Sequence, residues 1–397
     1  MRRIFLCFVS AGTWYKGLAM VSFSAIAVST AVSQAVLQCD QFTGADTGTK
    51  ISNCIAALPS SGGIADARNF GNAGTNTISL QLTVGTSTKP VQLLINPTTV
   101  FTVKVAGNVC AIPISNGSSV IAAGAGGNGS NGGTFQIDGT AHISSVFCNS
   151  PQDGTTEWFW LEGVTIRGNS GATITQGLIS LSGIFTNSGI RNVYTELCYA
   201  PSALYLTAPS GGTINVTSDI VFDNDNFDCT GQSTGPVVNI ATPSASALGN
   251  VAFRSSPIQH AGPNQKLLQI TGTGGSGTSQ CANIHFSDEG FETYPNGGGS
   301  STPVTIADCA DVILDNVTIS GTVPVGSNSF FTLSETQSGN LSNFRIRNVH
   351  MLTGSGSAQW THVVNNTIDH TTHNGTVYIQ GGGVQELGEY TFRSPNN

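Results

Sequence analysis

The chain has 397 residues, of which 49 are glycine and only 9% are charged, whereas an average soluble domain has about 7% glycine and about 25% charged residues. Its 39% of hydrophobic residues can build a core, so the low charge does not indicate a disordered chain. The glycines follow no three-residue period, and Gly, Ser, Thr and Asn disfavour long helices. Collagen-like and helical proteins are thereby excluded, and the composition predicts an all-β, turn-rich body.

The net charge of −8, with only 14 Lys and Arg, argues against a nucleic-acid partner, because phosphate binding requires clustered basic residues.

The N-terminus has the pattern of a secretory signal. Arg2, Arg3 and Lys16 precede an apolar run over residues 18–32 that ends in small residues. The run is shorter than the roughly 20 residues that span a bilayer. We expect residues 1–33 to be a signal peptide, the mature protein to be secreted and extracellular, and no membrane association to remain after cleavage.

The central part of the chain contains a repeat of about 31 residues. Each unit has a large apolar residue, a variable residue, a small or Asn-like residue, one further residue and, two positions after that, another apolar residue. The variable residues occur at intervals of 29, 32, 31, 33, 28 and 32: Glu162, Arg191, Asp223, Arg254, Ser287, Asp315 and Arg347. This two-residue alternation predicts a solenoid of β-coils about 4.8 Å apart, with stacked Asn amides. A propeller is the weaker alternative, because its blades are usually about 40 residues or longer.

Eight cysteines remain after removal of Cys7, and an even number in a secreted chain favours disulfides. Successive pairs are 15, 38, 31 and 28 residues apart, and the last three spacings are close to the repeat length. We expect sequential pairing; metal binding is the weaker alternative, since no Cys-x-x-Cys pair occurs. The expected pairs are Cys39–Cys54, Cys110–Cys148, Cys198–Cys229 and Cys281–Cys309.

The segment before the repeats resembles a known entrance motif. The order of Gly44-Ala45-Asp46-Thr47-Gly48, a short capping helix expected over residues 51–58, and a first strand at Gly62-Gly63-Ile64-Ala65 is similar to the start of pectate-lyase-like right-handed parallel β-helices. This superfamily includes pectate lyases, polygalacturonases, rhamnogalacturonases and phage tailspikes. With the coils, the resemblance covers most of residues 40–390. It implies an N-terminal cap with a short helix over residues 34–60, and an all-β, single-stranded right-handed parallel β-helix over residues 61–397.

The resemblance also implies a polysaccharide or oligosaccharide partner, and a monomer or a trimer. The catalytic motifs of polygalacturonases do not occur, and the nearest match to the pectate-lyase motif, residues 254–260, has a different spacing and ends in His260. A non-catalytic glycan-binding protein, adhesin or structural fibre therefore remains the alternative to a lyase or a glycoside hydrolase.

Stacked coils convert the repeat into columns on the outer surface. In the column of variable residues, opposite charges alternate at coil spacing, which indicates either a surface ion ladder or a sugar-binding groove lined by Arg191, Asp223 and Arg254. Five positions further, a second outward column is expected: Arg167, Glu196, Asp228, Gln259, Glu292 and Ser320. Together with two intervening residues, these columns predict an acidic patch of Glu196, Asp223, Asp225, Asp228, Glu289 and Glu292; a solvated face is the alternative.

Two catalytic hypotheses fit this patch. In a hydrolase, Asp228 and Glu292 would lie two coils apart, roughly 9.6 Å, near the separation of about 6.5 to 9.5 Å typical of inverting enzymes. Glu196 would lie one coil from Asp228 and raise the pKa of one carboxyl. In a lyase, Asp223, Asp225 and Asp228 would hold Ca²⁺ and Arg254 would act as the base. Without Ca²⁺ the negative charge favours a neutral glycan.

Three further groups of residues are candidates. Asp225, Glu289 and His260 are expected beside Arg191 and Asp223 as substrate-binding residues, although His260 fits a structural role as well. Trp158 and Trp160 alternate on a strand and either stack on sugar rings or close the core. Asp369, His370 and His373 could bind a metal, but a plain loop is favoured there.

Overall fold

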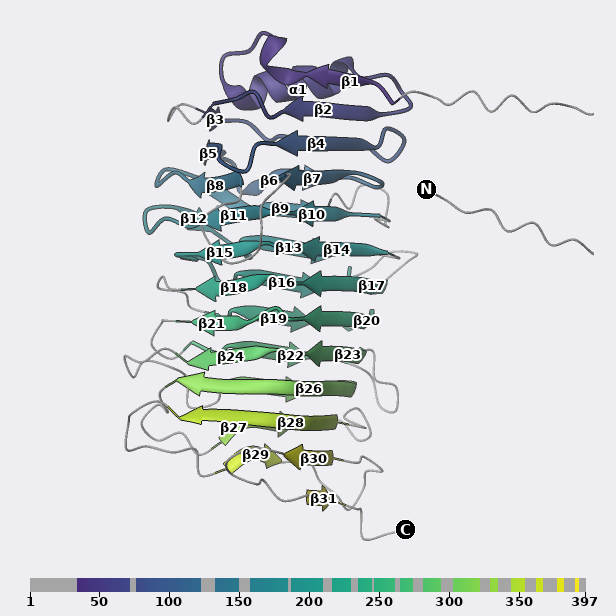
Figure 1. Ribbon diagram of the computed structural model, residues 1–397, viewed down its shortest axis with the longest axis vertical. Helices are drawn as coiled ribbons and strands as arrows, with labels where there is room; N and C mark the ends of the chain where they lie inside the picture. The colour runs from purple at the N-terminus through teal and green to yellow at the C-terminus, as the bar shows by residue number, and fades with distance from the viewer. Residues whose placement is uncertain are drawn as a thin grey trace, which may run out of the picture. The chain divides into compact units, whose positions relative to one another are not determined.

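The computed structural model describes residues 34–71, 76–122, 133–149, 158–184, 187–209, 216–229, 235–244, 246–260, 265–273, 281–293, 303–321, 329–334, 344–353, 362–366, 377–381 and 390–392. The expected signal peptide, residues 1–33, and the expected metal ligands Asp369, His370 and His373 lie outside these residues. The described chain forms a right-handed parallel β-helix, as the resemblance implied (Figure 1).

Two parallel sheets run along the stack of coils. The larger sheet has 21 strands in the described part of the chain: β1 (Val36–Gln38), β2 (Gly63–Ala67), β3 (Asn76–Ile78), β4 (Val91–Ile95), β5 (Val100–Val103), β7 (Ser119–Ala122), β8 (Gly133–Ile137), β10 (Trp160–Glu162), β11 (Val164–Arg167), β14 (Ser188–Arg191), β15 (Tyr194–Glu196), β17 (Val216–Asp223), β18 (Asn226–Cys229), β20 (Ala247–Arg254), β21 (Ile258–His260), β23 (Cys281–Ser287), β24 (Gly290–Thr293), β26 (Ala310–Gly321), β28 (Phe344–Thr353), β30 (Val377–Gly381) and β31 (Tyr390–Phe392).

The smaller sheet closes the other side of each coil. Its ten described strands are β6 (Val109–Ile114), β9 (His142–Asn149), β12 (Thr173–Ile174), β13 (Ile179–Ser182), β16 (Leu204–Thr207), β19 (Val238–Ala241), β22 (Leu268–Thr271), β25 (Val304–Ala307), β27 (Ser329–Ser334) and β29 (His362–Asn366). None of these strands contains Lys, Arg, Asp or Glu. Among the described strand pairs, only β30 and β31 run antiparallel.

The predicted repeat is the coil itself, because equivalent residues of successive units pair in register. Arg191 pairs with Asp223, Asp223 with Arg254, and Arg254 with Ser287. The first residue of every unit is buried, and so are all described side chains of the apolar column four positions after the variable residue. The alternation of apolar and polar residues along each strand therefore directs one set inward and the other outward.

The structure explains why each unit has a small or Asn-like residue at its third position. In all seven units this residue is left-handed, with φ between 48° and 71°: Gly163, Asn192, Asn224, Ser255, Asp288, Asn316 and Asn348. Gly, Asn and Asp adopt this region most readily. The residue bends the larger sheet between two consecutive strands, such as β17 and β18. The predicted amide stacking also occurs, since Asn224 Nδ2 donates to Asn192 Oδ1 at 2.7 Å.

Phenylalanine rings stack along the axis in the middle of the β-helix. The rings of Phe222 and Phe253 are 4.4 Å apart and nearly parallel, and those of Phe253 and Phe286 are 4.6 Å apart. Phe227 meets Phe253 edge-on at 6.3 Å. All four side chains are fully buried, and offset stacking adds to the free energy of burying these rings.

All four disulfides pair sequential cysteines, as the spacing predicted. Cys110–Cys148 joins the paired strands β6 and β9, and Cys198–Cys229 joins the turn after β15 to β18. These bonds link one coil to the next, which explains why their spacing is close to the repeat length. Disulfides form and persist in oxidising environments. Within the described residues, no helix is long and apolar enough to cross a lipid bilayer.

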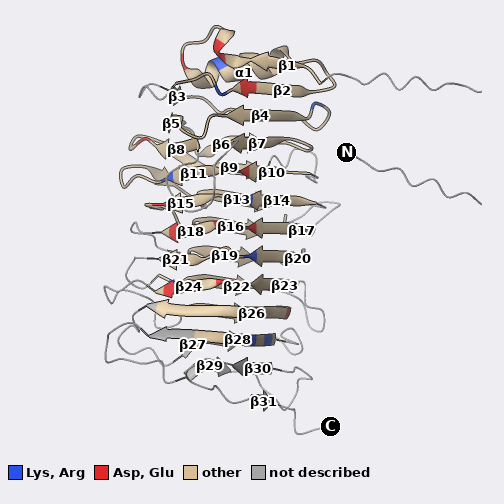
Figure 2. Cartoon of the chain, viewed as in Figure 1, with Lys and Arg blue, Asp and Glu red and all other residues tan. Residues whose placement is uncertain are grey.

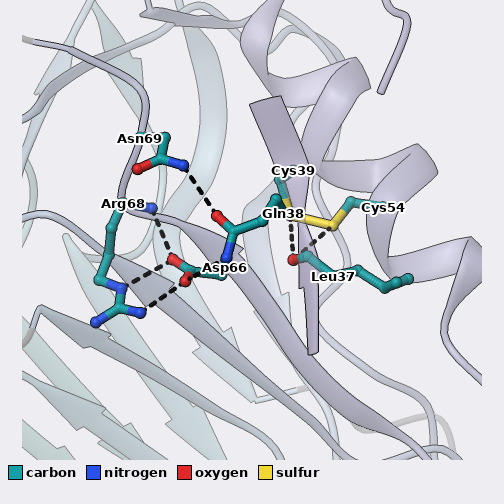
Figure 3. Close-up of a disulfide and its surroundings, with 7 residues drawn as sticks. All are labelled: Leu37, Gln38, Cys39, Cys54, Asp66, Arg68 and Asn69. Carbon is teal, nitrogen blue, oxygen red and sulfur yellow. Dashed lines mark hydrogen bonds and ion pairs between the residues drawn. A yellow bond between two sulfur atoms is a disulfide. The ribbon is translucent and has the colours of Figure 1, made fainter. Parts of the chain in front are cut away.

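The first coil is capped by helix α1 (Thr47–Ala57), which begins four residues earlier than the sequence indicated. Asp46 starts it, because its carboxylate accepts a hydrogen bond from the Thr49 amide at 2.7 Å. The Cys39–Cys54 disulfide ties α1 to the 3-10 turn η1 (Cys39–Gln41) (Figure 3).

Close to this disulfide, a buried carboxylate is fully hydrogen-bonded. Asp66, in β2, accepts from Arg68 Nη2 at 2.6 Å and Nε at 2.9 Å, and from Gln38 Nε2 at 3.0 Å (Figure 3). The Arg68 hydrogen bonds lower the pKa of Asp66 to about 2. Because Asp66 is 3% exposed and both of its carboxylate oxygens accept hydrogen bonds, its role is to stabilise the cap.

Candidate functional site

The first outer column consists of Glu162, Arg191, Asp223, Arg254, Ser287, Asp315 and Arg347. The ladder of the larger sheet places all seven in direct succession, as predicted. Two ion pairs form along it: Arg191 Nε lies 3.1 Å from Asp223 Oδ2, and Arg347 Nη2 lies 2.8 Å from Asp315 Oδ2. Figure 2 shows these charges on the strands of the larger sheet. The ion-ladder interpretation is thus correct for these two pairs.

Arg254 differs from its neighbours in this column. Its side chain is exposed, and no carboxylate of the described residues pairs with it, because Asp223 is engaged by Arg191 on the preceding coil. On the following coil, the hydroxyl of Ser287 donates to the Phe253 carbonyl at 3.3 Å. His285, two residues before Ser287 on the same strand, has a buried Nε2 with no hydrogen-bond partner among the described residues. Arg254 is therefore a guanidinium available to a ligand.

The second outer column consists of Arg167, Glu196, Asp228, Gln259, Glu292 and Ser320. The register of the paired strands confirms its order at Arg167–Glu196, Asp228–Gln259–Glu292 and Glu292–Ser320. Glu196 forms an ion pair with Arg167. Asp228 is 7% exposed, while Glu292 is half-buried. Asp228 and Glu292 are two strands apart with Gln259 between them, which corresponds to about 9.6 Å.

Two members of the predicted acidic patch lie in the interior, and a third, Asp228, is only 7% exposed. Asp225 is 2% exposed and Glu289 is 1% exposed, so the expectation that they bind substrate on the outer face is wrong. The reason is the left-handed residue before each of them, Asn224 and Asp288, which interrupts the strand alternation and turns the next side chain into the interior.

Asp225 and Glu289 belong to an internal column, which we call the bend column: Val164, Val193, Asp225, Ser256, Glu289, Val317 and Val349. In its polar part, each side chain accepts a backbone hydrogen bond from the preceding coil. The Val193 amide donates to Asp225 Oδ1 at 2.9 Å, and the Asp225 amide donates to Ser256 Oγ at 3.2 Å. The Ser256 amide donates to both carboxyl oxygens of Glu289, at 3.0 and 3.1 Å.

Burial controls the protonation of these two carboxyls. Desolvation raises the pKa of Glu289 to about 8, against the opposing effect of the Ser256 hydrogen bonds. Desolvation likewise raises the pKa of Asp225 well above its usual range. Raised carboxyl pKa values occur in catalytic acids, but both groups lie in the core, out of reach of a polymer. Their role is structural.

The expected calcium ligands do not come together. Asp223 lies on the outer surface in an ion pair with Arg191, whereas Asp225 lies in the interior. Within the described residues, no group of three or more His, Cys, Asp or Glu is arranged to hold a metal ion. The arrangement of Asp223, Asp225 and Asp228 therefore does not fit a Ca²⁺ site.

The described part of the structure does not include the side chain of His260; its backbone pairs with Cys229 and Thr293 at the end of β21.

Trp158 and Trp160 reach the outer surface at the start of β10. Phe159 and Leu161, which alternate with Trp160, are fully buried, and Trp158 is 49% exposed. The indole of Trp160 covers Gly189 of the next coil so closely that a Cβ there would lie 2.7 Å from the ring. The Arg191 guanidinium lies 5.9 Å from the centre of the Trp160 ring, a cation–π arrangement.

The backbone of Trp158 is left-handed, with φ +59°. The equivalent residues of the next five coils are also left-handed, but they are Asn187, Asp219, Asn250, Asn283 and Asp311. A left-handed conformation costs an ordinary L-residue about 1–2 kcal/mol, and bulky residues adopt it rarely. Among the equivalent residues of these six coils, Trp158 alone is bulky.

Comparison with known proteins does not assign the chain to a family. No protein-family model matches the chain, and no curated protein matches it. Among solved structures, a chain described as ORF18 of Geobacillus virus E2 is similar with a TM-score of 0.49 and 14% sequence identity. The match covers 89% of this chain and 63% of that one, so this chain spans less than two thirds of the phage protein. The class of protein defined here is a disulfide-linked parallel β-helix.

Proposed function

We propose that this protein is a secreted β-helix of the pectate-lyase-like kind that binds a polysaccharide along the outer face of its larger sheet. The observation that carries the proposal is Arg254, an exposed guanidinium without an ion-pair partner in the described residues, on a column whose neighbouring arginines are paired. The four disulfides and the basic-apolar N-terminus support an extracellular location.

The column suits a linear polymer for a physical reason. Its half-exposed side chains recur at the strand spacing of about 4.8 Å along the axis, and a stack of repeats forms an extended binding surface. A guanidinium presents five donors in a fixed fork, which can engage sugar hydroxyls or a sugar carboxylate. The Arg191–Asp223 pair on the preceding coil offers both donors and acceptors to the same chain.

Arg254→Ala is expected to weaken glycan binding about ten-fold or more, because a charge-assisted hydrogen bond contributes roughly 1.5–3 kcal/mol. Binding is measured on a polysaccharide array and then by calorimetry on the glycans that bind. Arg347→Ala is the matched control: Arg347 lies in the same column, but Asp315 holds it. Equal losses in the two variants, or no loss in Arg254→Ala, would contradict the proposed binding face.

Cleavage of the bound polymer is the second candidate function, and the register of the second outer column favours it. Asp228 and Glu292 lie on either side of Gln259, so their backbones are about 9.6 Å apart, near the carboxyl separation that leaves room for a water molecule in inverting glycosidases. Glu196 is held by Arg167 and thus fits a positioning role. In this hypothesis, one carboxyl protonates the leaving oxygen and the other activates water.

If the protein is a hydrolase, Asp228→Asn and Glu292→Gln are each expected to reduce the release of reducing ends at least about 100-fold. Asp315→Asn is the control, since Asp315 lies on the first outer column. The assay is run with and without Ca²⁺ and also follows unsaturated ends, which only a lyase produces. Wild-type protein that releases neither product while still binding glycan is a binding protein and not an enzyme.

A further inference from the structure

We propose that Trp158, supported by Trp160, Gly189 and Arg191, forms a stacking subsite for a neutral pyranose ring. This inference deepens the proposed function and rests on it. The subsite lies where the first outer column begins, one coil before the Arg191–Asp223 pair. A glycan that follows the column toward Arg254 would thus pass this position.

The first argument is the use of a bulky residue where the fold does not need one. Five successive coils place Asn or Asp at the position equivalent to Trp158, with nearly the same backbone angle. These residues tolerate the left-handed conformation, whereas an indole is disfavoured there. Trp158 also remains 49% exposed, so it contributes little to the core. Strained residues of this kind concentrate at binding sites.

The second argument is the rigid aromatic surface at Trp160, two residues after Trp158. The ring of Trp160 lies against Gly189, whose missing side chain leaves the space for it. The guanidinium of Arg191 contacts the same ring and is itself fixed by Asp223. Since these groups are already held in place, little side-chain entropy is lost when a ligand binds.

The third argument concerns the charge of the ligand. Glu162 follows Trp160 on the same strand, faces outward, and pairs with Arg191 in the ladder. The positive charge of Arg191 is engaged by Asp223. The carboxylate of Glu162 accepts hydrogen bonds from hydroxyls and repels anionic groups. An uncharged pyranose, with its apolar face on the indole of Trp158 and its hydroxyls toward Glu162, fits these groups better than a uronate.

Trp158→Asn tests the inference, because it introduces the residue type that the other coils use. Affinity is measured by calorimetry for cellohexaose and laminarihexaose, with hexagalacturonate as the anionic comparison, and thermal unfolding is followed by circular dichroism. We expect binding of a neutral hexasaccharide to weaken about ten-fold or more, with an unchanged or higher midpoint of unfolding. Trp158→Phe, which keeps an aromatic face, is expected to retain most of the affinity.

Several outcomes would overturn the inference: unchanged affinity in Trp158→Asn, a lowered unfolding midpoint in that variant, tighter binding of hexagalacturonate, or no binding of either neutral hexasaccharide by the wild type. Arg254→Ala, measured in the same titrations, separates this inference from the proposed function. If only Arg254→Ala loses affinity, the binding face is correct and the stacking subsite is wrong. If only Trp158→Asn loses affinity, the stacking subsite is correct and the binding face proposed around Arg254 is wrong.

Discussion

Glu289→Gln is expected to raise the free energy of unfolding by about 2–4 kcal/mol at pH 8 and to change it little at pH 4. Below pH 4.5 the Glu289 carboxyl is protonated in both the folded and the unfolded chain. Between pH 4.5 and about 8 the unfolded chain releases this proton, but the buried side chain retains it. Wild-type stability therefore falls as the pH rises through this window, at up to about 1.4 kcal/mol per pH unit, and levels off above it.

Glutamine removes this dependence because it is uncharged at every pH and its amide oxygen can still accept the hydrogen bond from the Ser256 amide. The measurement is urea unfolding of both proteins at intervals from pH 4 to 9. Glu292→Gln is the control, because the side chain of Glu292, three residues further, faces outward. This variant should keep the dependence of the free energy of unfolding on pH. Asp225, whose pKa burial also raises, is expected to maintain a residual slope. Identical pH profiles for wild type and Glu289→Gln would show that Glu289 is not protonated in the fold.

Phe253→Ala is expected to lower the free energy of unfolding by about 3–5 kcal/mol, the usual cost of truncating a buried phenylalanine. Phe253 is fully buried and stacks on Phe222 and Phe286 at 4.4 and 4.6 Å. Its removal opens a cavity in the centre of one coil and leaves both neighbouring rings without their stacked partner. Rigid sheets on both sides of the core limit the collapse that could fill this space.

Urea unfolding measures this loss, and Arg254→Ala provides the control, since the neighbouring side chain points outward and should change stability by less than about 0.5 kcal/mol. Because each coil contacts only the next ones, hydrogen exchange is expected to accelerate first in β17, β20 and β23, which carry the three stacked rings. A loss below about 1 kcal/mol, or exchange that accelerates evenly along the chain, would contradict this description of the core.

Much of the fold could be predicted because a solenoid makes its contacts between equivalent positions of neighbouring units. Residues that recur every 31 positions or so are the residues that touch, as Arg191, Asp223 and Arg254 do. Three of the four disulfides followed for the same reason, since cysteines about one repeat apart lie on adjacent coils. The order of both outer columns could thus be read from intervals in the sequence.

The candidate site was less predictable, because side-chain direction depends on backbone angles that the repeat does not reveal. Asp225 and Glu289 were expected on the surface by counting alternate positions, but Asn224 and Asp288 are left-handed and reverse that count. The signal that this column faces inward was the valine at equivalent positions of other units, Val193 and Val317. Trp158 was likewise identified only when its backbone conformation could be compared with those of Asn187 and Asp219.

The high glycine content, the low charge and the repeat by themselves determined that the chain forms stacked β-coils with its charges gathered on one side. That much follows from periodicity, because burial requires apolar residues at constant intervals. Only the tertiary structure decided which charges face solvent, which are buried, and which arginine of the first outer column has no carboxylate partner among the described residues. These properties depend on single left-handed residues and on competition between neighbouring coils for the same carboxylate, as Arg191 and Arg254 compete for Asp223.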